Sequence, residues 1–179
     1  MAIAEEIYER GQRCLREAAV WLQQAADGQI PTPGAIAARR TAADMAADTA
    51  TALLRQAFIT PIDREDLWVF WEACEAVLCA VEEVALTAYC CGRTVPTGCA
   101  NAVIQTAAVC RGIAENFPNS TVTVPVLRSL RDAERTCYET RRAVFENATA
   151  RRICEALQEA LRACAAVCSV QRYCAVKNT

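Results

Sequence analysis

The side chains that could do chemistry in this 179-residue chain are acids and cysteines spaced four residues apart. Asp44 and Asp48 form one such pair, and Glu75 and Cys79 form a second, with Glu82 further along. Side chains four residues apart share one face of a helix, so two helices carrying these pairs could surround a cation. A thiolate among carboxylates suits zinc or iron better than magnesium or calcium. The opposing hypothesis is a solvated acidic face with no metal, which the small number of ligands favours.

Twelve cysteines raise the question of a disulfide or redox framework. In a short secreted chain this number would indicate a disulfide scaffold. This sequence instead starts with an acidic segment rather than an export signal, and it has long helical periods. Cys-x-x-Cys motifs and histidine are both absent from it, which excludes a thioredoxin-type motif and the common zinc-finger patterns. We therefore expect reduced thiols.

Their positions divide the cysteines into two groups. Five fall on apolar helical stripes, where a free cysteine acts as a small hydrophobic side chain, and are predicted to pack in the core: Cys14, Cys74, Cys110, Cys137 and Cys164. The other seven lie off the stripes or near helix ends and are predicted to be within reach of oxidants or metal: Cys79, Cys90, Cys91, Cys99, Cys154, Cys168 and Cys174. Cys90 and Cys91 are adjacent, so a disulfide between them would be strained.

The composition argues against several functional classes. Histidine, the usual general acid or base at neutral pH, is absent. The sequence also lacks a nucleophile elbow, a P-loop and a Gly-x-Gly-x-x-Gly motif. A net charge of -2 and a pI near 5.3 argue against nucleic-acid binding, which requires surplus Lys and Arg. We expect a protein that is not an enzyme and does not bind nucleic acid.

The apolar periodicity predicts six helices and no strand. The expected helices cover residues 2–26, 35–57, 61–91, 99–116, 124–147 and 150–175. With 54% hydrophobic residues, the chain can form one domain with a helical core. The segment from Gly92 to Gly98 divides it into halves of residues 1–92 and 98–179. Because the sequence has no apolar run of membrane-spanning length, we expect a cytoplasmic protein, for which a peripheral location at the inner face of the membrane stays open.

The joint between the second and third expected helices carries a helix-start pattern. Thr60 is a good N-cap, and Pro61 suits the first helical position because its missing N–H costs nothing there. Asp63, Glu65 and Asp66 follow, and the helix dipole favours acids in a first turn by ~0.3–1 kcal/mol each. The pattern predicts that the third helix starts at about residue 61.

This joint also carries a family resemblance. The run Phe-Ile-Thr-Pro-x-Asp-Arg-Glu-Asp resembles the signature of the PhoU-like family of small helical phosphate-transport regulators, with matches at Phe58, Thr60, Pro61, Asp63, Arg64, Glu65 and Asp66. Weaker agreement is found at Asp44, Glu82, Glu83, Phe145 and Val176-Lys177-Asn178. The resemblance implies a six-helix bundle made of two three-helix repeats. It also implies a non-enzymatic accessory role in inorganic phosphate uptake, with docking on the cytoplasmic face of a transporter of the inorganic-phosphate-permease type.

The family's metal-binding pattern, repeated acid-x-x-x-acid motifs, is eroded in this chain. Glu75 and Cys79 stand where the family tends to have two aspartates. In the last helix Arg162 and Ala166 take the place of a paired aspartate motif, and in the preceding helix Glu134 is flanked by basic side chains. We therefore expect a divergent member in which only the first half keeps part of a site.

Two other hypotheses remain open. One is a redox sensor or metal-binding protein that uses the accessible thiols, namely Cys79, Cys90, Cys91, Cys154, Cys168 and Cys174. The other is an interaction scaffold that keeps the fold without a metal. The alanine-rich second and sixth helices allow close approach between helices or subunits, so a homo-oligomer is also consistent with the sequence.

Overall fold

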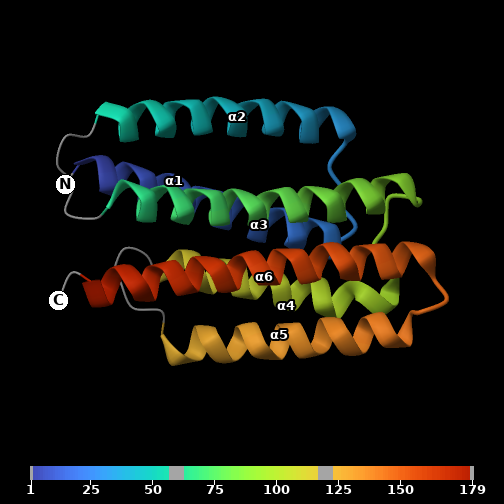
Figure 1. The fold of residues 1–179 in the computed structure, drawn as a ribbon. Coiled ribbons are helices and arrows are strands. Elements are labelled where there is room, and N and C mark those ends of the chain that lie inside the picture. Colours follow the sequence, from blue (N-terminus) through green and yellow to red (C-terminus); the bar gives the residue numbers. More distant parts are fainter. Residues whose placement is uncertain (1, 57–62, 117–122, 178–179) are drawn as a thin grey trace.

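The computed structural model describes residues 2–56, 63–116 and 123–177, and these are almost entirely helical (Figure 1). Within these ranges there are six α-helices and no strand: α1 (Ala2–Ala26), α2 (Pro33–Gln56), α3 (Arg64–Cys90), α4 (Ala100–Glu115), α5 (Val124–Ala143) and α6 (Ala148–Lys177). A short 3₁₀ helix, η1 (Thr97–Cys99), precedes α4. The predicted all-α class with six helices is confirmed.

Four helices form the centre of the bundle, and two lie outside it. α3 packs along α6, while α1 packs on both α3 and α4. α5 covers α4 and α6 on one side, and α2 lies against α3 and α1 on the opposite side (Figure 1). In the described residues, contacts between the first three helices and the last three run through α1 with α4 and through α3 with α6.

The core consists of apolar side chains at three- and four-residue spacing, as the sequence predicts. On α3, the side chains that are at most 1% exposed include Leu67, Phe70, Trp71, Cys74, Val77, Leu78 and Val81. On α6, the same holds for Ile153, Leu157, Leu161, Cys164 and Val167. Fully burying one large apolar side chain contributes about 1.5–3 kcal/mol. The contact between α3 and α6 is therefore a main source of stability.

The start of α3 differs from the prediction. The helix begins at Arg64, and Asp63 takes the N-cap position with φ -59° and ψ 140°, so the start predicted at residue 61 was wrong. Aspartate is as good an N-cap as threonine, and the two competing signals lie only three residues apart. Glu65 and Asp66 do lie in the first turn, as expected. Three signature residues fall outside the described ranges: Phe58, Thr60 and Pro61.

The end of α5 also differs from the prediction, which placed it at residue 147. The helix ends at Ala143, and the Val144 N–H donates to the Thr140 carbonyl oxygen (2.9 Å). Asn147 then caps α6, because its Oδ1 accepts the Ala150 N–H (3.0 Å). Asparagine is more favourable at an N-cap than in a helix interior, which explains the earlier end.

The mid-chain break falls where the sequence predicts it. Gly92 has φ +100°, a left-handed conformation that favours glycine. The Arg93 N–H returns to the Ala88 carbonyl oxygen (3.0 Å), which closes the end of α3. η1 follows and places Cys99, which is fully buried, at the start of α4.

Candidate functional site

The predicted metal ligands lie where α2 meets α3, and an arginine stands among them. Arg40 of α2 donates from Nε to Oε2 of Glu82 on α3 (3.1 Å), and the two side chains form an ion pair. The Glu82 side chain is only 3% exposed, so Arg40 compensates a carboxylate that is almost completely removed from water. The hydrogen bond to Glu82, together with the charge of Glu82, raises the pKa of Arg40.

Three more of the predicted ligands interact with this pair. The charges of Cys79 and Asp44 add to the rise in the pKa of Arg40. Glu75 interacts electrostatically with Asp44 and Glu82. Burial is the main cause that raises the pKa of Glu75, and the charge of Asp44 adds to it. Burial also raises the pKa of Cys79, although the neighbouring Arg40 opposes this shift. Four of the five predicted ligands thus interact electrostatically with one guanidinium, that of Arg40.

This arrangement does not fit a metal ion as it stands. The guanidinium of Arg40 already supplies the positive charge that a cation would bring to Glu82. Asp48 lies one turn beyond Asp44 along α2 and is exposed. In the described part of the chain, His, Cys, Asp and Glu side chains form no group of three or more that could hold a metal. Zinc or iron at these residues stays a prediction, and binding would require Arg40 to leave Glu82.

The neighbouring arginine of α2 is directed to α1. Arg39 forms an ion pair with Glu17 and hydrogen bonds with the Cys14 thiol. Burial raises the pKa of Cys14 to about 11, and Arg39 acts in the opposite direction. Few side chains of α2 are buried within its described residues: Ile36, Ala50 and Leu54. The two arginines are therefore a substantial part of what holds α2 on the bundle.

The cysteines divide differently from the prediction. The five that were expected in the core are buried: Cys14, Cys74, Cys110, Cys137 and Cys164. Of the other seven, Cys79, Cys90 and Cys91 are exposed, as predicted, and the Cys174 side chain lies outside the description. Cys99, Cys154 and Cys168 are buried, so the prediction was wrong for them. Cys154 and Cys168 are buried because α6 packs on α3, α4 and α5 at once, and Cys99 is buried because η1 packs against α4, α5 and α6.

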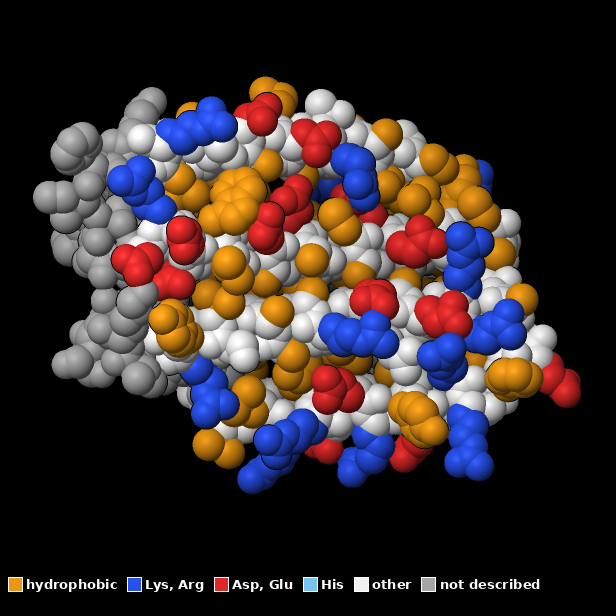
Figure 2. Space-filling view, viewed as in Figure 1, with side chains coloured by type: hydrophobic (Ala, Val, Ile, Leu, Met, Phe, Trp, Pro, Cys, Tyr) orange, Lys and Arg blue, Asp and Glu red, His pale blue; other side chains and the backbone are white. Residues whose placement is uncertain are grey.

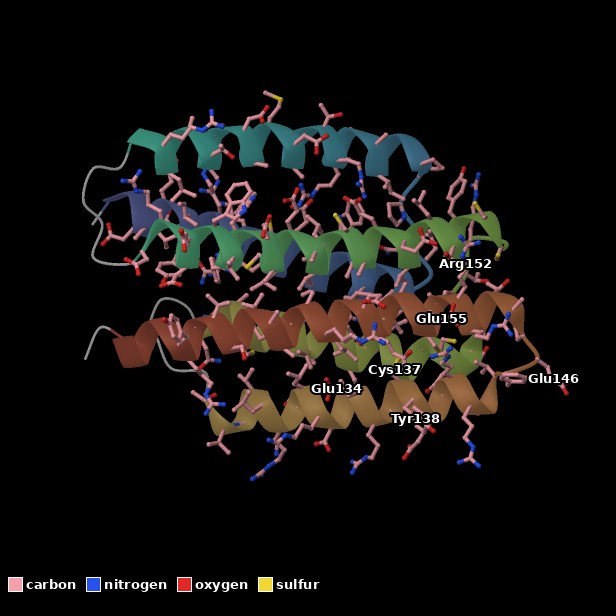
Figure 3. The ribbon with its side chains drawn as sticks, viewed as in Figure 1. Glu134, Cys137, Tyr138, Glu146, Arg152 and Glu155 are labelled. Carbon is pink, nitrogen blue, oxygen red and sulfur yellow. The ribbon has the colours of Figure 1, made fainter. Side chains whose placement is uncertain are left out.

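Two pairs of buried thiols lie between α6 and the segments that pack on it. The Cys99 and Cys154 sulfurs are 3.8 Å apart. The Cys110 and Cys164 sulfurs are also 3.8 Å apart. Cys137 lies between α5 and α6 (Figure 3) and donates to the Cys154 carbonyl oxygen (3.2 Å). The contact with Cys154, together with burial, raises the pKa of the Cys99 and Cys137 thiols.

The sequence analysis missed these pairs, although the spacing contained a signal. Cys99 and Cys110 are separated by about three helical turns, and so are Cys154 and Cys164. Equal intervals in two segments allow thiols to meet pairwise if the segments run parallel and in register. Periodicity identifies the apolar face of each helix separately, and it does not say which faces meet.

A cleft of about 400 Å³ opens where the end of α3 meets the start of α6. Cys90 and Cys91 line this cleft and are exposed. The Thr149 hydroxyl donates to the Cys91 sulfur (3.2 Å). Arg152, which lies between the two helices (Figure 3), pairs with Glu83 across the cleft, with Nε 3.4 Å from Oε1. The cleft therefore combines two accessible thiols with an ion pair.

Alkylation rates should separate the exposed thiols from the buried ones. With iodoacetamide at neutral pH, Cys79, Cys90 and Cys91 should be labelled first, because they are exposed. Cys99 and Cys154 should react at least about 10³-fold more slowly, since labelling requires an opening that costs ~4 kcal/mol or more. Peptide mass spectrometry over time measures each rate. The control is the chain unfolded in urea, in which all twelve cysteines should be labelled. Equal rates for Cys154 and Cys79 would contradict the buried arrangement.

Comparison with known proteins adds no relative to this description. No protein-family model matches this chain, and no curated protein matches it. The resemblance at residues 58–66 therefore stands on the residues of the joint alone.

Proposed function

We propose that this chain is a non-enzymatic accessory protein of inorganic phosphate uptake, which docks on the cytoplasmic face of a phosphate transporter. The observation that carries the proposal is the pairing of corresponding helices. α1 packs with α4 and α3 packs with α6, while α2 and α5 occupy equivalent outer positions. Two three-helix repeats joined through their first and third helices account for this pairing. It is the architecture that the resemblance at the α2–α3 joint implies.

The outer face of α5 is the part of the surface that we assign to docking. It carries exposed arginines, which gather along the edge that α5 forms in Figure 2: Arg128, Arg131, Arg135 and Arg142. Basic side chains are attracted to the anionic inner leaflet around a transporter, at about 1 kcal/mol each near the surface. A stretch apolar and long enough to cross a membrane is not found in any helix of the described ranges. Docking from outside the bilayer is consistent with both observations.

Phosphate uptake in cells tests this role. Uptake of radiolabelled phosphate should change in a strain that lacks the gene, and the wild-type chain should restore it. Restoration should fail for the variant Arg128→Glu/Arg131→Glu/Arg142→Glu, and the transporter should no longer copurify with it. The matched control is Arg13→Glu/Arg16→Glu on the exposed face of α1. Unchanged uptake in the deletion strain would contradict the proposal.

A thiol-based redox sensor is the second candidate, and the exposed pair in the cleft favours it. Cys90 and Cys91 are adjacent and accessible beside Thr149. A sensor should convert one defined set of thiols under mild peroxide, whereas incidental thiols react slowly and diffusely. Mass spectrometry of the oxidised chain distinguishes the two. Diffuse oxidation would favour a scaffold without redox function.

A further inference from the structure

We propose that Cys99 and Cys154, supported by Cys137, form a buried binding site for a soft monovalent metal ion of the Cu(I) class. The inference rests on thiol geometry and is independent of the proposed role in phosphate uptake. All three side chains are fully removed from solvent. They come from three separate segments, η1, α6 and α5, so the site exists only in the folded chain.

The donor set consists of sulfur, and its spacing lets one ion reach both sulfur atoms. The Cys99 and Cys154 sulfurs are 3.8 Å apart. Metal–thiolate bonds of about 2.3 Å allow one ion to bridge two sulfurs that are up to about 4.6 Å apart. Thiolates select Cu(I), whereas hard cations require carboxylate or carbonyl oxygens. Zinc takes four ligands, and the described residues place no third Cys, His, Asp or Glu in position to complete such a set.

Binding at this site is a ligand exchange without electron transfer. Cu(I) arrives held by two thiolates of a small carrier thiol such as glutathione. Two Cu–S bonds to the carrier break, and two Cu–S bonds to Cys99 and Cys154 form. The two S–H protons of the protein pass to the released carrier thiolates. Cys137 supports the pair by position, because its thiol donates to the Cys154 carbonyl oxygen (3.2 Å) and so holds α5 against this turn of α6.

The cleft at the start of α6 is linked to this pair by hydrogen bonds. Cys91 is exposed in the cleft between α3 and α6, and the Thr149 hydroxyl contacts its sulfur (3.2 Å). The next residue, Ala150, accepts a hydrogen bond from the Cys99 thiol through its carbonyl oxygen (3.5 Å). Two hydrogen bonds and the Thr149–Ala150 peptide unit therefore link an accessible thiol to the buried pair. Cys91 is the thiol at which we expect an ion to arrive from a carrier.

The pair Cys110 and Cys164 provides a matched comparison. It has the same sulfur separation and burial, but it lies about 15 Å further along α6. The cleft with its surface thiols lies at the start of α6, near Cys154 and away from Cys164. We therefore assign the site to Cys99 and Cys154 alone.

Anaerobic titration of the full chain with Cu(I) against bicinchoninate tests the site. The parent protein is the variant Cys79→Ser/Cys90→Ser/Cys91→Ser, which lacks the three thiols that are exposed in the described residues. It should take at least one Cu(I) per chain from the chelator, with a thiolate-to-copper absorption band. Cys154→Ala in this parent should weaken binding of that ion by more than the 10–100-fold that loss of a supporting residue costs, and Cys164→Ala should leave it unchanged.

The controls keep a folding defect apart from a lost ligand. Cys99→Ala is the second ligand variant, and circular dichroism with a thermal melt checks that each variant is folded. Transfer kinetics test the route, because restoring Cys91 to the parent should speed loading at least about tenfold without changing the amount bound. A parent that binds no copper would overturn the proposal. So would a folded Cys154→Ala variant that binds as tightly as the parent.

Discussion

Replacing Gly11 by alanine should destabilise the protein by about 1–2 kcal/mol, although alanine is the better helix former. A Cβ at residue 11 would lie 2.6 Å from Cε1 of Phe70 and 3.0 Å from Sγ of Cys74. Phe70 is 1% exposed and packs edge-on against Tyr8, with ring centroids 5.0 Å apart, so its ring has little room to shift. Overpacking of this kind costs ~1–3 kcal/mol, which outweighs the ~1 kcal/mol gained in helix propensity.

Gly112 provides the matched control for this prediction. It is also helical, but the nearest atom to an added Cβ is Cγ2 of Val126 at 3.7 Å, an ordinary van der Waals contact. Gly112→Ala should therefore be neutral or stabilising by up to ~1 kcal/mol. Urea denaturation of both variants measures the difference. A Gly11→Ala variant as stable as Gly112→Ala would show that α1 and α3 are not packed as closely as described, and Gly11→Ala/Phe70→Leu should recover part of the loss.

The amphipathic pattern determined most of the fold in advance, because it reflects burial directly. The apolar stripe predicted for the third helix, including Leu67, Trp71 and Leu78, is the buried face of α3. Helix ends were harder, since two polar residues often compete for the same cap. Asp63 took the N-cap position near the predicted Thr60, and Asn147 ended α5 early. Local preferences of this kind differ by less than about 1 kcal/mol, so tertiary packing decides between them.

The candidate sites were less predictable, because they depend on which helix faces meet. The spacing of Asp44, Glu75 and Cys79 predicted a shared site, and in the structure Asp44 and Cys79 each interact electrostatically with Glu75. It gave no sign that Arg40 would stand among them, since Arg40 and Glu82 are distant in sequence. The buried pairs of thiols were missed for the same reason. The periodicity of α6 alone does not indicate that Cys154 meets Cys99 of η1 and Cys137 of α5.

Replacing Arg40 by alanine should lower the free energy of unfolding by about 2 kcal/mol. The Glu82 carboxylate, whose side chain is 3% exposed, would lose its partner. Removing one member of a fully buried ion pair costs ~3–5 kcal/mol, but Arg40 is 55% exposed, so solvent reduces the loss. Glu82→Gln in the same variant should recover part of the stability by removing the uncompensated charge. Thermal or urea unfolding measures each step.

Arg162 supplies the control, because its pair with Glu159 is exposed on both sides and Arg162→Ala should cost at most ~0.5 kcal/mol.

The Arg40→Ala variant also tests the metal prediction. The variant removes the positive charge of Arg40 and leaves three side chains that could bind a cation in its place: Glu75, Cys79 and Glu82. Zinc should then raise the melting temperature of the variant and leave the wild type unchanged. Zinc stabilisation of the wild type would instead mean that Arg40 moves aside for a metal, whereas no effect on either protein would remove the metal prediction.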